Sequence, residues 1–395
     1  MPWKEADVMD LRMQFVTRAL REEMPFAALC REFGISAKTG YKWKQRFLDD
    51  GYGGLADLSR RPAAHARQLD ESTIFEIVRL KQRHMRWGPA KIRELFRRTH
   101  PGRDCPSLST VKRMLGKCGL VERRRRRQQK QTGRISQRRE ATAANQVWTV
   151  DFKGWWFSSE RERVQPLTVC DAYSRCVLLA QALPDSRSDT VRECFSRLFE
   201  QYGLPQCIRS DNGTPFAASN ALLGLSRLSA WWLALGISLD RIDPGRPDQN
   251  GSHERMHREI ACEVESRVDG DLPTQQAALD IWREEYNTQR PHEAIGMCCP
   301  AELYVKSQRR FRSEEFELHY PAGYLRRKVT GNGCFKLDRR LINLTTALRG
   351  WHVGLQPQGS QEYRVWFAQL CLGRLNLRDE VVLPLEAGQV RSNTR

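Results

Sequence analysis

Val147-Trp-Thr-Val-Asp-Phe-Lys-Gly-Trp-Trp-Phe157 is the stretch that decides the fold, because β-branched and aromatic residues at this density are typical of a strand. Two further strand candidates follow at residues 167–170 and 176–182, and a short one at 206–210 ends directly before Asp211-Asn212-Gly213. Strands that come first and then alternate with helices indicate an α/β layer with a mixed sheet. The helices are expected at residues 190–202, 221–235, 250–268 and 273–288, with a further short strand at 237–242.

The residues before this stretch predict two helix-turn-helix modules. In the first module, Gly34-Ile35 forms a tight turn between two helices, and Ser36 is a good N-cap for the second of them. In the second module, Gly88-Pro89 opens one helix and Ser109 is expected to cap the next. A helix that enters the major groove of DNA carries short polar and cationic side chains on one face. The candidates of this kind are Ser36, Lys38, Thr39, Lys42, Gln45 and Arg46 in the first module, and Thr110, Lys112 and Arg113 in the second.

The positive charge of the chain is concentrated in its first third. Residues 1–142 hold 33 basic and 16 acidic side chains, whereas the rest is nearly balanced, and the 395 residues together carry a net charge of +18. A concentrated basic field indicates a polyanionic partner, most economically nucleic acid. Residues 121–142 lack hydrophobic periodicity, and we expect a disordered linker there in the free protein. On DNA, Arg123, Arg124 and Arg125 of this segment would follow the phosphates.

Several classes of protein are excluded early. No apolar run approaches the roughly 20 residues that a membrane helix needs, so no membrane partner is expected. The first residues include acidic side chains where a signal peptide requires an apolar core. The 12 cysteines contain no CxxC pair, which favours reduced thiols in the cytoplasm over a cysteine-based zinc site.

The chain becomes strand-rich again after about residue 310, which predicts a small barrel or sheet. The predicted fold class is therefore multidomain: N-terminal all-α helix-turn-helix modules, a central α/β core with a mixed sheet, and a small all-β domain at the C-terminus. The expected boundaries are 1–62 for the first module, 63–120 for the second, 121–142 for the basic linker, 143–308 for the core and 309–395 for the β-rich domain.

Three acidic residues stand out by their positions. Asp151 lies inside an otherwise apolar strand, Asp211 ends a second strand, and Glu254 lies early in a helix. A carboxylate within a buried strand is costly unless it is paired or binds a metal ion. Three converging carboxylates would suit Mg²⁺, and two such ions can activate a nucleophile and stabilise the leaving oxygen in phosphoryl transfer. Taken singly, each residue also has an ordinary structural interpretation as a buried acceptor, a turn former or a solvated helix residue.

Five motifs occur in an order that resembles a known family. The series is similar to the integrase core of bacterial insertion-sequence transposases, the DDE superfamily with a ribonuclease-H-like fold. The resemblance covers residues 145–305 most strongly, and the helix-turn-helix start and β-rich end match one bacterial branch of the family. The motifs are Trp148-Thr-Val-Asp151-Phe, Asp171-Ala-Tyr-Ser-Arg175, Ser210-Asp211-Asn-Gly-Thr-Pro-Phe216, Pro247-Asp-Gln-Asn-Gly-Ser-His-Glu254-Arg-Met-His257 and Tyr286-Asn-Thr-Gln-Arg-Pro-His292.

The resemblance implies a function and a set of site residues. Asp151, Asp211 and Glu254 would be the catalytic, metal-binding triad, with Mg²⁺ as cofactor and Mn²⁺ as a substitute. The enzyme would be a polynucleotidyl transferase that binds the terminal inverted repeats of its element, cuts the DNA and joins it to a target by a two-metal mechanism. Its partner would be double-stranded DNA, on which a homo-oligomer pairs two ends, in the bacterial cytoplasm at the nucleoid. Supporting roles would fall to Asn212, Gly213, Asn250, Gly251, Arg255 and His257.

Two alternatives for the third ligand and its helix stay open. Many relatives place about 35 residues between the second Asp and the Glu, whereas 42 separate Asp211 from Glu254, so Asp248 is a rival. The Asn-Gly-x-x-Glu-Arg context favours Glu254. His253-Glu254-Arg-Met-His257 also satisfies the H-E-x-x-H pattern of zinc metalloproteases, although the surrounding charged residues and the family motif count against that function.

Two alternatives for the whole chain belong to other functional classes. A DNA-binding regulator with an inactive core would keep the helix-turn-helix modules without a working triad. A general ribonuclease-H-like nuclease would cut DNA without needing two recognition modules.

Overall fold

The computed structural model describes residues 7–57, 69–121, 140–219, 221–243, 251–312 and 317–384. The chain divides into two compact units, Met1–Asp70 and Glu71–Arg395. The first unit is a bundle of α1 (Val8–Leu20), α2 (Phe26–Glu32) and α3 (Ala37–Asp50), followed by the short 3₁₀ helix η1 (Gly51–Leu55). Ser36 caps α3 by accepting a hydrogen bond from the backbone N–H of Thr39 at 3.2 Å, as the sequence predicts.

The core of this bundle explains how α3 is presented. Phe15 and Trp43 are buried between the helices, and Gly40 of α3 faces Phe15 so closely that a Cβ atom would lie 2.9 Å from its ring. The buried face of α3 is thus packed against α1 and α2, and its opposite face remains exposed. This is the arrangement that a reading helix requires.

A second helical group begins the other unit. It contains α4 (Glu71–Arg83), α5 (Pro89–Thr99) and α6 (Leu108–Lys117) around Ile77, Phe96 and Val111. The predicted cap of α6 is wrong by two residues. Ser107, not Ser109, is the N-cap, because its hydroxyl accepts from the backbone N–H of Thr110 at 3.3 Å.

Side-chain contacts join this helical group to the core that follows it. Arg98 of α5 forms a salt bridge with Glu302 and donates to the backbone carbonyl of Met297 at 2.7 Å. His84 Nδ1 lies 2.9 Å from a carboxylate oxygen of Glu285.

The central sheet is mixed, as predicted. Its strand order is β4 (Val177–Leu183), β3 (Arg163–Asp171), β1 (Val147–Phe152), β5 (Cys207–Ser210) and β6 (Ser238–Arg241), with β2 (Trp156–Phe157) paired to the beginning of β3. The β4–β3–β1 part is antiparallel, whereas β1, β5 and β6 run parallel. The stretch from Val147 to Phe157 thus supplies β1, the strand at which the antiparallel and parallel parts of the sheet meet.

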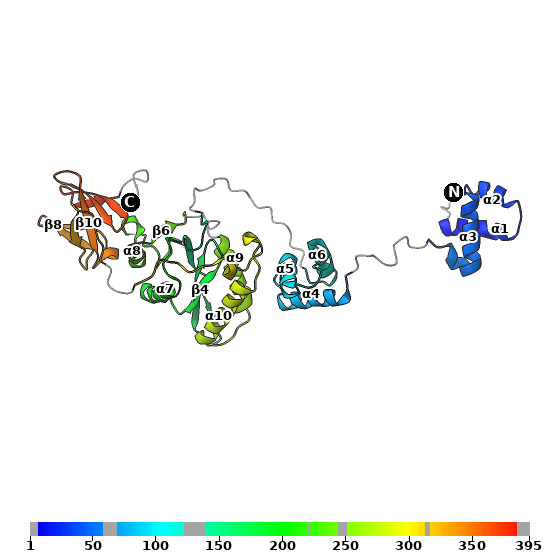
Figure 1. The fold of residues 1–395 in the computed structure, drawn as a ribbon, viewed down its shortest axis with the longest axis horizontal. Helices are drawn as coiled ribbons and strands as arrows, with labels where there is room; N and C mark the ends of the chain where they lie inside the picture. The colour runs from blue at the N-terminus through cyan, green and yellow to red at the C-terminus, as the bar shows by residue number, and fades with distance from the viewer. Residues whose placement is uncertain are drawn as a thin grey trace. The chain divides into compact units, whose positions relative to one another are not determined.

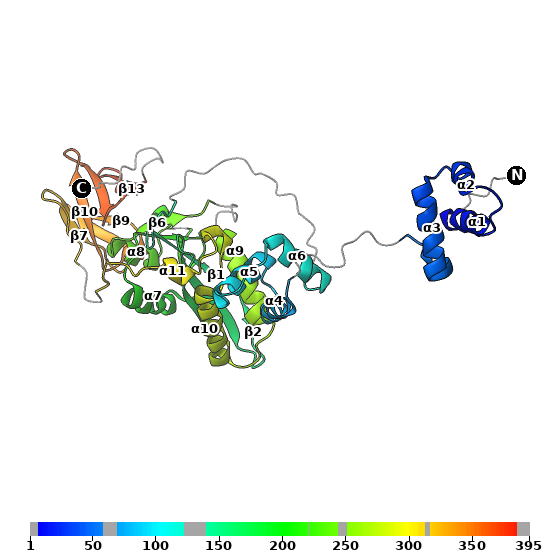
Figure 2. The ribbon, with the colours of Figure 1, turned by 45° about the vertical axis from the view of Figure 1, so that its right-hand side comes forward.

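Helices cover both faces of this sheet (Figures 1 and 2). On one face, α7 (Ser188–Tyr202) and α8 (Arg227–Ala234) pack against Trp148 and Val150 of β1. On the other face lie α9 (Gly251–Ile260), the π-helical segment η4 (Ala261–Glu265) and α10 (Leu272–Thr288). Side chains alternate along a strand, so Thr149 and Asp151 of β1 point to the α9 side.

The last part of the chain is a seven-stranded sheet in the order β7-β10-β11-β12-β13-β9-β8. The predicted fold class is therefore confirmed in all three of its parts. The sequence predicts four of the seven strands, at residues 324–329, 334–337, 363–367 and 370–375. It does not predict the other three, since β9 is largely exposed, β10 contains Gly and Pro, and β13 has three residues. The bounds are β7 (Leu325–Lys328), β8 (Cys334–Leu337), β9 (Arg340–Asn343), β10 (His352–Pro357), β11 (Glu362–Phe367), β12 (Leu370–Asn376) and β13 (Val381–Leu383), and the short α11 (Pro300–Leu303) precedes them.

None of the helices described here is both long and apolar enough to cross a bilayer.

Candidate functional site

The register of the central sheet brings two of the predicted carboxylates to neighbouring positions. Thr149 of β1 lies opposite Arg209 of β5 in a parallel pairing, so two residues further along, Asp151 and Asp211 occupy equivalent places at adjacent strand ends. Adjacent strands are about 4.8 Å apart, and side chains at equivalent positions of two strands point to the same face of the sheet. This proximity of residues 60 positions apart in the sequence follows from the pairing of β1 with β5.

The loop after β5 holds Asp211 in a defined turn. Asp211 Oδ1 accepts a hydrogen bond from the backbone N–H of Gly213 at 3.1 Å. A Cβ atom on Gly213 would lie 3.0 Å from the Asp211 carboxylate, so this position favours glycine. Asn212 donates from Nδ2 to the backbone carbonyl of Ile242 at 2.7 Å, which ties the loop to the end of β6. The predicted supporting residues Asn212 and Gly213 thus shape the turn.

Helix α9 carries the third predicted carboxylate in its first turn. Met256 and Ile260 pack against the sheet, and His253 is also buried on that side. Glu254 follows His253 by one residue, about 100° around the helix, and is exposed. Among the described residues, Asp151, Asp211 and Glu254 do not form a group whose ligand atoms all lie within one metal's reach.

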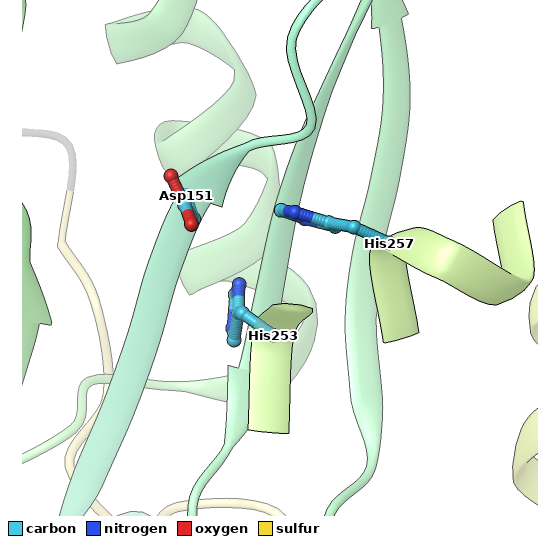
Figure 3. A group of neighbouring side chains, drawn as sticks. All are labelled: Asp151, His253 and His257. Atoms are coloured by element: carbon cyan, nitrogen blue, oxygen red, sulfur yellow. The ribbon is translucent and has the colours of Figure 1, made fainter. Parts of the chain in front are cut away.

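Two histidines of α9 instead approach Asp151. One ligand atom each from Asp151, His253 and His257 lies within 4.8 Å of the other two. Figure 3 shows the three side chains directed into one space between strand β1 and helix α9. His257 was predicted as a supporting residue, whereas His253 was noted only as part of the H-E-x-x-H pattern.

Two buried threonines hold these imidazoles in place. Thr149 Oγ1 lies 2.7 Å from His253 Nε2 and donates to the backbone carbonyl of Cys170 at 3.3 Å. Thr168 Oγ1 lies 2.8 Å from His257 Nε2 and donates to the backbone carbonyl of Asp151 at 3.0 Å. With each hydroxyl proton directed to a carbonyl, the tautomer that fits has each imidazole donating its Nε2–H to the neighbouring hydroxyl. Thr168 Oγ1 also lies 3.4 Å from His253 Nδ1.

The burial of the two rings sets their protonation. Burial lowers the pKa of His253 to about 3, with neighbouring His257 adding to the shift. Burial likewise lowers the pKa of His257 to about 4, and the positive charge of Lys153 contributes. Both imidazoles are therefore neutral at physiological pH, and each retains one nitrogen with a lone pair.

His292, at the end of the core helices, offers a test of pH-dependent stability. Burial lowers its pKa to about 3, and Lys91 and Arg290 add to the shift. The unfolded chain takes up this proton near pH 6.5, so the stability from His292 is complete above pH 6.5 and is lost as the pH falls toward 3. We expect the unfolding free energy to drop by up to about 1.4 kcal/mol per pH unit for this group. His292→Gln should reduce the slope of the unfolding free energy against pH by the equivalent of one proton. Urea titrations between about pH 7 and pH 5 measure this slope.

Exposed His319 provides the matched control for this measurement. His319→Gln should leave the pH dependence of the parent protein unchanged. An identical slope in the His292→Gln variant and the parent would show that His292 does not contribute as argued.

The remaining predicted residues differ in their surroundings. Lys38, Lys42, Lys112, Arg113 and Arg255 are exposed. Others are engaged within the protein: Gln45 donates to Asp49 at 2.9 Å, Arg46 donates to the backbone carbonyl of Ala56 at 2.7 Å, and Thr39 and Thr110 bond to their helix caps, Ser36 and Ser107. Gly251 begins α9. Outside the described residues lie Arg123, Arg124, Arg125, Asn250 and the rival ligand Asp248.

Comparison with protein families gives consistent matches along the chain. Residues 141–247 and 235–300 match two integrase core domain families. Residues 11–63 match a helix-turn-helix domain family, and residues 39–115 match a homeodomain-like domain family.

Individual proteins resemble the chain over longer ranges. The "Insertion element IS407 uncharacterized 31.7 kDa protein" of Burkholderia multivorans is 28% identical over 261 residues, which is 64% of this chain and 88% of the relative. The "Insertion element IS476 uncharacterized 39.2 kDa protein" of Xanthomonas euvesicatoria is 28% identical and covers 63% of this chain and 70% of its own length. Among solved structures, the HTLV-2 integrase catalytic core domain in complex with magnesium is 14% identical, covers 42% of this chain and 99% of its own, and has a TM-score of 0.33.

Proposed function

Because the chain belongs to the DDE integrase superfamily, among the bacterial insertion-sequence transposases, we propose that it binds the ends of its own element and catalyses DNA cleavage and strand transfer. The observation that supports this proposal is the parallel register of β1 with β5, in which Thr149 lies opposite Arg209, so that Asp151 and Asp211 follow at the ends of adjacent strands. The substrate would place the protein on the bacterial nucleoid.

The proposed catalytic triad is Asp151, Asp211 and Glu254. The first two present carboxylate oxygens from adjacent strand ends, and the donor set fits Mg²⁺, with Mn²⁺ as a substitute. Glu254 lies in the first turn of α9, next to His253, whose ring contacts Thr149 at 2.7 Å. When bound, divalent metal ions would polarise the scissile phosphate and stabilise its leaving oxygen. The three carboxylates would hold those ions, while Gly213 and Asn212 keep the Asp211 turn in position.

DNA recognition is proposed for the helices that precede the core. Exposed Lys38 and Lys42 on α3, and Lys112 and Arg113 on α6, would contact the duplex. Two modules on one chain can contact two stretches of one element end and so raise the effective concentration of the second contact. A homo-oligomer would pair two such ends.

A strand-transfer assay with labelled element ends tests the proposal. The full chain, the ends, a target plasmid and Mg²⁺ should yield joined products. Cleavage without joining would instead favour a ribonuclease-H-like nuclease, and a gel shift without cleavage would favour a DNA-binding regulator with an inactive core. Either of these results would overturn the proposed function.

Lys42→Ala is expected to weaken binding to the element ends. Lys42 is exposed on α3, with its Nζ 4.8 Å from the centroid of the Trp43 ring, and loss of one DNA contact costs about 1–3 kcal/mol, or about fivefold or more in affinity. Footprinting and gel-shift titration measure this effect. The matched control is Lys44→Ala on the same helix, because Lys44 lies two residues from Lys42, about 200° around the helix, and is half-buried. Equal affinities of the two variants would contradict the role of α3 as the reading helix.

A further inference from the structure

The H-E-x-x-H segment of α9 has a feature that the proposed triad does not use. His253 and His257 are four residues apart and therefore share one face of the helix. That face is turned toward Asp151, and the three side chains place one ligand atom each within 4.8 Å of one another (Figure 3). Glu254, between the histidines in the sequence, is exposed and does not belong to this group of described residues.

We propose that Asp151, His253 and His257 form a binding site for a transition-metal ion of the zinc class. Mg²⁺ prefers oxygen ligands, whereas imidazole nitrogen suits Zn²⁺, Co²⁺ and Ni²⁺. Two nitrogens and one carboxylate oxygen make three protein ligands, the number that leaves a fourth position open on Zn²⁺. Bond lengths of about 2.0–2.2 Å set the ligand atoms roughly 3.4 Å apart, a separation that small side-chain rotations reach from the present spacing.

The surroundings of the histidines support a metal-binding role. Metal-bound imidazoles usually donate their second N–H to a fixed acceptor, which sets the orientation of the ring. The hydroxyls of Thr149 and Thr168 are such acceptors, because both donate their own protons to backbone carbonyls. Both threonines are almost completely buried, so water does not compete for these contacts. In this tautomer Nδ1 of each ring carries the lone pair for an ion, and Nδ1 of His253 lies 3.4 Å from Thr168 Oγ1.

The site shares Asp151 with the proposed catalytic triad. An ion held by Asp151, His253 and His257 would occupy a carboxylate oxygen that the magnesium ions need, so the transition-metal ion would compete with Mg²⁺ and inhibit strand transfer. This inhibition rests on the proposed function, whereas the binding of the ion does not. The exposed position of Glu254 also separates this site from that of a zinc protease, in which the glutamate must act beside the metal.

Cobalt binding tests the proposal without any measurement of activity. Titration of the metal-free full chain with Co²⁺ should produce a visible absorption band that saturates at one equivalent. His257→Gln and Asp151→Asn should each weaken Co²⁺ binding by at least about tenfold. Because His253 is buried and its replacement can disturb folding, His257, which is only partly buried, is the primary variant, and circular dichroism checks each protein.

Two control variants test whether Co²⁺ binding depends on the three proposed ligands and not on other side chains. Glu254→Gln and His319→Gln should keep the Co²⁺ band at parental strength. A near-ultraviolet thiolate-to-cobalt band would assign the ion to cysteines, and loss of the visible band in Glu254→Gln but not in His257→Gln would assign it to the carboxylate triad. Either result, or no saturable band at all, overturns this proposal. Mg²⁺-dependent joining without Co²⁺ binding would overturn the inference and keep the proposed function. Co²⁺ binding without any joining of DNA would keep the inference and overturn the proposed function.

Discussion

Asp151→Asn is expected to reduce strand transfer by at least about a thousandfold, or about 4 kcal/mol in transition-state free energy. Asparagine has nearly the same shape, so β1 and its pairing with β5 should be retained. It lacks the negative charge that a carboxylate next to Asp211 would supply to divalent metal ions at the scissile phosphate. Affinity for the element ends should not change, because the residues proposed to contact the ends lie on α3 and α6 and not on β1. Joined products on labelled ends and a gel shift with the same DNA measure the two quantities.

The matched control for this variant is Asp189→Asn. Asp189 is an exposed aspartate in the first turn of α7, and its neutralisation should leave joining nearly unchanged. Asp151→Asn with more than about a tenth of the parental activity would remove Asp151 from the catalytic role. Loss of end binding in Asp151→Asn would instead reveal a folding defect.

Asp171→Ala is expected to lower the unfolding free energy of the core by about 3–5 kcal/mol. Asp171 is completely buried at the end of β3. Its carboxylate accepts hydrogen bonds from the backbone N–H of Asn145 at 2.7 Å, and from the backbone N–H and hydroxyl of Ser174 at 2.8 and 2.7 Å. Alanine would leave three donors in the interior without this partner. Urea unfolding followed by tryptophan fluorescence reports the change, because Trp148 and Trp232 are buried in the same core.

Asp280→Ala on α10 controls for the loss of a carboxylate at a solvent-exposed position. The side chain of Asp280 is 53% exposed, and its contact with Arg283 is long at 3.9 Å. The unfolding midpoint of this variant should stay close to that of the parent. A similar midpoint for Asp171→Ala would mean that the strand-end turn does not depend on its carboxylate.

Local chemistry was sufficient to predict most of the fold. The β-branched and aromatic residues of β1 identified the central strand, and Ser36 identified the start of α3. Ser107 and Ser109 are equally good caps by composition, and the sequence alone could not decide which hydroxyl reaches the N–H of Thr110. Strand β10 was missed because its Gly and Pro are unfavourable in a strand, and it forms by pairing with β7 and β11.

The site was predictable only as far as positions along single strands and helices. The alternation of β1 indicates that Asp151 and Thr149 share a face, but the contacts of that face depend on which helix packs there. The association of Asp151 with His253 and His257 arises from the packing of α9 on β1 and β3. The H-E-x-x-H spacing was the available signal, since it places two histidines on one helix face.

The hydroxyl group of Thr168 links the strand of Asp151 to helix α9, because it donates to the backbone carbonyl of Asp151 and contacts His257. Thr149 makes a second link to α9 through its contact with His253. A rotation of α9 about its axis that moves Glu254 toward Asp211 would break both of these threonine–histidine contacts. Each hydrogen-bonding group left without a partner would cost about 1–3 kcal/mol. The two threonines therefore fix the rotation of α9 about its axis, and with it the exposed position of Glu254.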